Sequence, residues 1–279
     1  MRIRIDFAYD GTDFHGWALQ PGLRTVQGEL QAALARALRV EEAWVTVAGR
    51  TDTGVHARGQ VCHLDVDPEV LVASAGRSPE SPVDALTRRL NGILPADVRV
   101  RRSSEAPAYF DARFSAIWRR YQYRVADATA CYDPLRRHEV LHWQRPLDLD
   151  VMNAAAADLT GLRDFTTFCK AREGSTAIRD LRELRWEREP DGTATATVVA
   201  DAFCHSMVRS LVGCLIAIGE GRRSLSWAKE QLAAQARSSA IHLASPRGLT
   251  LEEVGYPPDA ELEARLLVTR NRRQADELD

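Results

Sequence analysis

The chain has 279 residues, of which 45% are hydrophobic and 27% are charged, and its formal net charge is −2 at pH 7. This composition is ordinary for a globular protein and excludes a globally basic one. The longest apolar run, 211–218, is too short to span a membrane, and the N-terminus lacks the apolar core of a signal peptide. The five cysteines are odd in number and include no C-x-x-C pair, which predicts reduced thiols in a cytoplasmic protein.

Charge is unevenly placed along the chain. Seven arginines but only two acidic residues lie between positions 99 and 124. From residue 252 to the end, eight acidic residues outnumber four basic ones. A basic middle and an acidic tail indicate a local patch that binds a polyanion.

The first part of the chain predicts a β-α-β-β-α-β order. Alternating polar and apolar residues indicate a strand at 2–9, and Thr25 can cap a helix that runs to about Leu38. Residues 10–17 form a loop that we expect to carry exposed aromatic side chains. Further segments complete the order: strands at 44–47 and 60–66, a helix at 81–93 and a strand at 97–103. This order is typical of ferredoxin-like domains.

The second part predicts another α+β unit with similar elements: strands at 117–126, 178–189, 193–201 and 249–254, and helices at 151–159, 204–218 and 227–236. We therefore expect an α+β protein with two ferredoxin-like (RRM-like) halves around a mostly antiparallel mixed sheet and a central active-site cleft. The predicted boundaries are 1–107 for the first half, 108–258 for the second and 259–279 for an acidic tail that could be disordered.

One polar stretch, Gly49-Arg50-Thr51-Asp52-Thr53-Gly54-Val55-His56, lies between the predicted strands at 44–47 and 60–66. Connections between strands often carry functional residues on a rigid scaffold. Glycine permits backbone angles that other residues avoid, and it lets a ligand approach closely. The structural alternative is a hairpin connection in which Asp52 makes an Asx-turn.

Three other patterns each allow a functional and a structural interpretation. His138-Glu139-Val140-Leu141-His142 matches the zinc-binding pattern H-E-x-x-H, but Pro134 and Pro146 leave little room for the helix that this pattern needs. His205 and Arg209 are spaced to share one face of a helix, where they could reach a cleft or pair with an acid. Tyr121 lies on a strand with alternating aromatics and is either a core residue or a stacking residue.

Several motifs together resemble those of the tRNA pseudouridine synthase A (TruA) family. The stretch 49–56 resembles the active-site motif of that family, and 9–17 resembles its N-terminal motif. Thr53 and Ser206 stand where the family frequently has alanine and histidine. Further matches, in the same order and spacing over nearly the whole chain, lie at 26–30, 110–116, 119–123, 164–168, 203–209 and 248–251.

The resemblance implies isomerisation of uridine to pseudouridine in the anticodon stem-loop of tRNA, at tRNA positions 38, 39 and 40, by a cytoplasmic homodimer that needs no cofactor and no metal. It implies that Asp52 is the catalytic nucleophile and that Arg209 keeps it ionised. Tyr121 is implied to be a catalytic residue that stacks on the flipped uracil and whose hydroxyl could shuttle a proton, and Arg50 assists base extrusion. We expect basic residues of the middle segment to neutralise phosphates of the tRNA backbone. These residues, which we call the tRNA track, are Arg113, Arg119, Arg120 and Arg124.

Two other functions remain open from the sequence. A non-catalytic RNA-binding module would use the aromatic and arginine side chains of a ferredoxin-like sheet without needing Asp52. A zinc metallopeptidase would use His138, Glu139 and His142.

Overall fold

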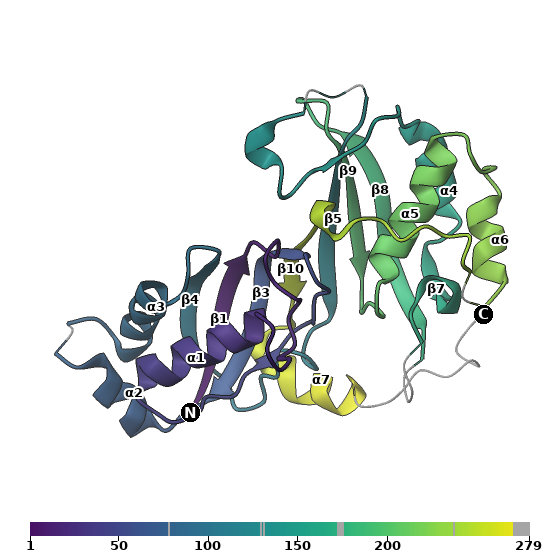
Figure 1. Ribbon diagram of the computed structural model, residues 1–279. Coiled ribbons are helices and arrows are strands. Elements are labelled where there is room, and N and C mark those ends of the chain that lie inside the picture. The colour runs from purple at the N-terminus through teal and green to yellow at the C-terminus, as the bar shows by residue number, and fades with distance from the viewer. Residues whose placement is uncertain (78, 129, 131, 172–175, 237, 270–279) are drawn as a thin grey trace. The chain divides into compact units, whose positions relative to one another are not determined.

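The structure is a computed structural model that describes residues 1–269 except 78, 129, 131, 172–175 and 237 (Figure 1). Its contacts divide the chain into two compact units, one formed by Met1–Ile117 with 251–269 and the other by Trp118–Thr250. These divisions differ from the predicted boundaries at residues 107 and 258, because the chain after residue 250 returns to the first unit. Cys131 and the end of the predicted tail lie outside the described residues.

The first unit contains an antiparallel sheet in the order β4-β1-β3, with β2 and β10 also next to β3. This order and orientation are those expected of the split βαβ arrangement. Its strands are β1 (Arg2–Tyr9), β2 (Thr46–Val47), β3 (His56–Asp65), β4 (Val98–Ala106) and most of β10 (Leu249–Gly255). Its helices are α1 (Val26–Leu38), α2 (Pro68–Ala75), α3 (Pro82–Ile93) and α7 (Leu262–Thr269), and a 3-10 turn covers Asp259–Glu261.

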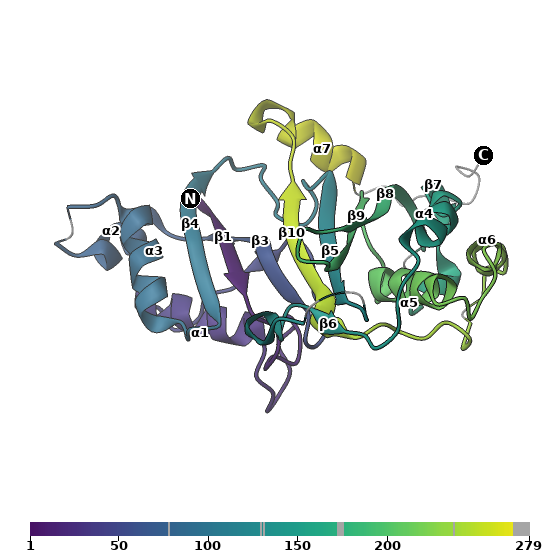
Figure 2. The same ribbon diagram turned by 90° about the horizontal axis from the view of Figure 1, so that it is seen from above.

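Local sequence signals explain the elements of the first unit. Every second residue of β1 is buried, as its alternation predicts. Thr25 caps α1, where its hydroxyl accepts a hydrogen bond from the Gly28 amide at 3.3 Å. Ser81 caps α3 in the same way through the Asp84 amide, at 3.2 Å. Helices α1 and α3 lie side by side (Figures 1 and 2) and α3 packs on β4, which closes the core of this unit.

The second unit contains a sheet in the order β5-β9-β8-β7, and each pair along it is antiparallel. A short strand, β6, runs parallel to β5. The strands are β5 (Trp118–Ala126), β6 (Leu141–His142), β7 (Gly161–Asp164), β8 (Ile178–Arg188) and β9 (Ala194–Ala200). The helices are α4 (Leu149–Ala157), α5 (Met207–Gly219) and α6 (Trp227–Ala233), and 3-10 turns cover Pro134–Arg136, Thr166–Phe168 and Pro246–Gly248.

In the second unit, the other helices pack against the apolar helix α5. Of the thirteen residues of α5 only Arg209 and Ser210 are not buried. Helix α4 packs against both α5 and β8, and α6 lies next to them (Figure 2). The α+β class and the mostly antiparallel, mixed strand arrangement expected from the sequence are therefore confirmed.

Two local predictions differ from the structure. Helix α2 occupies a segment for which the sequence predicts no helix, and Asp67 caps it through the Glu69 amide at 2.8 Å. Helix α7 lies in the predicted tail and is tied to the first unit, because Arg265 donates a hydrogen bond to the Ala116 carbonyl at 2.9 Å. Within the described part of the chain, no helix has the length and apolar character needed to cross a bilayer.

Candidate active site

Asp52 lies in the first unit, on the connection between β2 and β3. The two strands pair antiparallel, with Thr46 opposite His63 and Val47 opposite Cys62, so this connection belongs to a hairpin. Asp52 is half-buried, and its carbonyl accepts a hydrogen bond from the Val55 amide at 3.2 Å, which closes a tight turn. The connection predicted from the sequence is therefore present, and it presents Asp52 at a turn.

A second loop, residues 10–17, lies directly against the Asp52 turn. The Trp17 amide donates to the Thr51 carbonyl at 3.1 Å, and the Gly54 amide donates to the Phe14 carbonyl at 3.3 Å. The Gly11 amide donates to His56 Nδ1 at 3.0 Å. Two motifs about 40 residues apart in the sequence thus form one hydrogen-bonded structure around Asp52.

The aromatic residues of this second loop are buried, and the expectation that they are exposed is wrong. Phe14 is 1% exposed and Trp17 is 2% exposed. The Trp17 ring packs 5.9 Å from that of Phe7, and the Arg24 guanidinium covers the Phe14 ring at 4.1 Å. These rings anchor the loop to the core, so the backbone against which the Asp52 turn rests is rigid.

The glycines near Asp52 differ in what they do. Gly54 has a φ of +77°, a conformation that favours glycine. Gly49 has no such φ, and a Cβ added there would meet nothing within 4 Å. The tight approach occurs at Gly11 instead, where a Cβ would lie 2.0 Å from the Val55 carbonyl oxygen. Close packing around the Asp52 turn therefore depends on glycines of the other loop, Gly11 and also Gly16, where a Cβ would lie 2.9 Å from the Thr51 carbonyl oxygen.

A buried hydrogen-bond chain lies beneath the Asp52 turn. The Tyr9 hydroxyl is 2.7 Å from Thr51 Oγ1 and accepts a hydrogen bond from Gln60 Nε2 at 3.1 Å. Burial raises the pKa of Tyr9 to about 12, so its phenol is protonated at neutral pH. The sequence assigned no role to Gln60, and it assigned none to Tyr9 beyond a place at the start of the motif at 9–17.

Tyr121 and Arg209 lie in the second unit. Tyr121 is buried on β5, and its ring meets that of Phe203 edge-on, at a centroid distance of 5.1 Å. Arg209 is in the first turn of α5, and its Nε donates to the Ala244 carbonyl at 2.7 Å. Phe203 lies just before α5, so the segment that leads into this helix contacts the tyrosine, while the helix itself carries the arginine.

The predicted RNA-binding arginines differ in accessibility. Arg50 and Arg113 are exposed, whereas Arg119 and Arg120 are half-buried. Arg113 covers the Phe114 ring at 5.0 Å, and Arg119 donates to the Asp201 carbonyl at 2.7 Å. Arg124 is 7% exposed, and its guanidinium contacts Gln122 and Thr250. A phosphate could reach Arg113 directly, but it could reach Arg124 only if the packing around that side chain opened.

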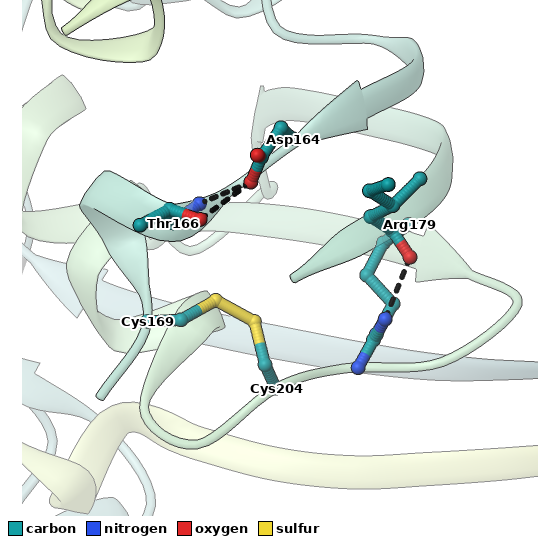
Figure 3. Close-up of a disulfide and its surroundings, with 6 residues drawn as sticks. Asp164, Thr166, Cys169, Arg179 and Cys204 are labelled. Carbon is teal, nitrogen blue, oxygen red and sulfur yellow. Dashed lines mark hydrogen bonds between the residues drawn. A yellow bond between two sulfur atoms is a disulfide. The ribbon is translucent and has the colours of Figure 1, made fainter. Parts of the chain in front are cut away.

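A disulfide joins Cys169 to Cys204, with their Cα atoms 5.7 Å apart (Figure 3). This corrects the expectation that all the thiols are reduced; Cys62 and Cys214 are free and buried. The bond connects the segment after the 3-10 turn Thr166–Phe168 to the loop that leads into α5. Closing a loop of 35 residues is worth about 4 kcal/mol in unfolded-state entropy. It also restrains the segment that carries Phe203.

The H-E-x-x-H pattern does not form a metal site. His138 and Glu139 lie in a turn, and His142 lies in strand β6, so the two histidines do not share a helix face. Glu139 accepts a hydrogen bond from Arg136 at 3.1 Å, and the His142 ring lies 4.8 Å from that of Tyr132. Among the described residues, no cluster of three or more histidine, cysteine, aspartate or glutamate side chains could hold a metal ion.

Comparisons with known proteins agree on one family. A family model described as tRNA pseudouridine synthase matches residues 155–257. The tRNA pseudouridine synthase A of Streptomyces griseus is 54% identical over 275 residues, which cover 98% of this chain and 94% of that protein. The proteins of the same name from Leifsonia xyli and Mycobacterium leprae are 51% and 49% identical, with coverage of 98% and 99% of this chain and 97% and 96% of theirs.

A solved structure of the archaeal box H/ACA sRNP Nop10–Cbf5 complex aligns with 77% of this chain and 43% of the matched chain. The TM-score is 0.32 at 10% identity, which is too low to support an inference. The sequence relatives are decisive, because they match nearly end to end at about half identity. The chain therefore belongs to the tRNA pseudouridine synthase A family, and it is an isomerase.

Proposed function

We propose that this enzyme converts uridine to pseudouridine at positions 38, 39 and 40 of the tRNA anticodon stem-loop, with Asp52 as the nucleophile. In this reaction the N1–C1′ bond of uridine breaks, the uracil turns, and a C5–C1′ bond forms. The proton on C5 is lost, and N1 gains one, so the reaction is redox-neutral. The observation that carries the proposal is the fixed turn that presents Asp52, in a chain 54% identical to a named tRNA pseudouridine synthase A.

The residues of the two units take complementary roles in this proposal. The Asp52 carboxylate attacks either C1′ of the ribose or C6 of the uracil, and it must be ionised to do so. The family resemblance assigns to Arg209 an ion pair with the carboxylate of the nucleophile, which a guanidinium stabilises through charge-assisted hydrogen bonds. Tyr121 stacks on the extruded uracil, and Arg50 helps to displace the base from the helical stack.

The proposed tRNA track consists of Arg113, Arg119, Arg120 and Arg124, and we propose a homodimer in the cytoplasm as the acting species. Two copies of a local basic patch would explain how a chain with a net charge of −2 binds a polyanion. Arg113 is the best-placed member because it is exposed and lies next to the Phe114 ring. Arg119 and Arg120 contribute along β5, and Arg124 contributes only if its packing opens.

Replacing Arg113 should make tRNA binding less dependent on salt. Each lost phosphate contact removes about one released counterion, so Arg113→Ala should reduce the slope of log Kd against log salt by roughly 1. Filter binding or fluorescence anisotropy across a salt series measures this slope. Arg88→Ala, which removes an equally charged side chain that pairs with Glu80 on the surface, is the matched control. An unchanged slope for Arg113→Ala removes this residue from the track.

The modified positions can be read directly in cells. Pseudouridine mapping of tRNA from cells with and without this protein should show signals at positions 38, 39 and 40 that depend on the protein. Signals that persist in its absence, or a loss at other positions only, would contradict the proposed specificity. A non-catalytic RNA-binding module predicts no isomerisation by the purified protein, and release of tritium from C5-labelled uridine in tRNA distinguishes the two functions.

A further inference from the structure

The buried hydrogen-bond chain beneath the Asp52 turn contacts two residues that precede Asp52. It reaches Gly49 at the backbone carbonyl and Thr51 at the side-chain hydroxyl. Gln60 is 0% exposed, and its Nε2 donates to the Gly49 carbonyl at 2.9 Å as well as to the Tyr9 hydroxyl. Tyr9, which is 4% exposed, then reaches Thr51 Oγ1. Two strands of the sheet, β1 and β3, thereby hold the segment that leads into Asp52 at two points.

Two partners of Gln60 set the direction of the hydrogen bonds that its side-chain amide makes. The Gly49 carbonyl can only accept, and the Val61 amide can only donate to Gln60 Oε1, at 3.3 Å. These two partners fix the orientation of the Gln60 side-chain amide. Its nitrogen therefore donates to the Tyr9 oxygen. Tyr9 and Thr51 share the next hydrogen bond, in which either hydroxyl can be the donor.

We propose that Tyr9 and Gln60 are positioning residues for the isomerisation, acting through Thr51 on the placement of the Asp52 carboxylate. The inference rests on the proposed role of Asp52. A displacement of about 1 Å can cost about 100-fold in rate, so a group that never touches the substrate can still control the chemical step. This hydrogen-bond chain holds the turn from its buried side, so the substrate approaches Asp52 from the exposed side.

Tyr9→Phe tests this because it keeps the ring and removes only the hydroxyl. We expect kcat to fall about 10- to 100-fold while the KM for tRNA stays within about twofold. A purely structural role would lower the melting temperature but would leave kcat per folded molecule unchanged. Tyr256→Phe is the matched control, since it removes another hydroxyl of the same unit, bonded to the Ala112 carbonyl at 2.7 Å. We expect it to keep the wild-type kcat.

A pair of substitutions at Thr51 keeps the test decisive if Tyr9→Phe folds poorly. Thr51→Ser retains the hydroxyl and should keep kcat within about threefold, whereas Thr51→Val retains the shape and should lose about as much as Tyr9→Phe. The double variant Tyr9→Phe with Thr51→Val should be no slower than Thr51→Val alone, because both changes break one chain. Equal kcat values for Thr51→Ser and Thr51→Val would overturn the inference. So would a loss of kcat in the double variant that equals the product of the losses in the two single variants.

Failure of this inference can be told apart from failure of the proposed function. If Asp52→Asn keeps turnover, the nucleophile is misassigned and the positioning argument falls with it. If Asp52→Asn is inactive and Tyr9→Phe retains the wild-type kcat, only the positioning role is overturned.

Discussion

Asp52→Asn should abolish isomerisation while tRNA binding survives. The substitution preserves the size and shape of the side chain but removes its negative charge, so the turn closed by the Asp52 carbonyl and the Val55 amide should persist. Without a carboxylate, no nucleophile remains at this position to attack the nucleoside. We expect kcat to fall by about 10⁴-fold or more, as when a nucleophile is removed from other enzymes, and the Kd for tRNA to change by less than about threefold.

The measurement is tritium release from C5-labelled tRNA under single-turnover conditions, together with a binding isotherm for the same tRNA. Asp158→Asn, the same chemical change on the exposed end of α4, is the control and should be fully active. Mass spectrometry of the variant should accompany the assay, because deamidation of asparagine would restore the aspartate. Turnover near the wild-type rate in an intact Asn protein would show that Asp52 is not the nucleophile.

The sequence predicted those parts of the fold whose causes are local. Thr25 and Ser81 precede apolar-periodic segments, and each caps the helix that follows it. The strand β1 alternates as its burial does. Helix α7 could not be predicted in this way, because it is held by Arg265 and the Ala116 carbonyl, residues far apart in the chain.

The sequence indicated the polar turn that contains Asp52, but it did not reveal the residues that hold this turn in place. The loop of residues 10–17 contains two glycines and several polar residues and therefore predicts exposure, yet the Phe14 and Trp17 rings fill the core beside it. The sequence places Tyr9 in the motif at 9–17 but does not reveal its hydrogen bond to Thr51, which is 42 residues away. Arg124 alternates in step with Arg120 on β5, but tertiary packing buries it. The Cys169–Cys204 pairing depends on a separation of 35 residues that no local pattern reveals.

Gly11→Ala should damage both stability and activity, because Gly11 is where the two loops meet most closely. A Cβ at this position would lie 2.0 Å from the Val55 carbonyl oxygen and 2.5 Å from its carbon. Both are backbone atoms, so relief requires the loops to separate. That movement would stretch the hydrogen bond from the Gly11 amide to His56 Nδ1, now 3.0 Å, and displace the turn that presents Asp52.

We expect a loss of about 3 kcal/mol in the free energy of unfolding, the upper range for an overpacked site. For a chain of this size that corresponds to a fall of roughly 6–12 °C in melting temperature. The kcat of the folded fraction should fall by about 100-fold, because a displacement of about 1 Å at the nucleophile is enough. Calorimetry and the tritium-release assay at a temperature well below the transition measure the two effects separately.

Gly92→Ala provides a matched comparison, because this variant should raise the free energy of unfolding rather than lower it. Gly92 is exposed within α3, and a Cβ there would meet nothing within 4 Å. Alanine restricts the unfolded chain more than glycine does and favours the helix, so the variant should gain about 0.5–1 kcal/mol with unchanged activity. If Gly11→Ala matched Gly92→Ala in stability and rate, the two loops could not be in the close contact on which the placement of Asp52 depends.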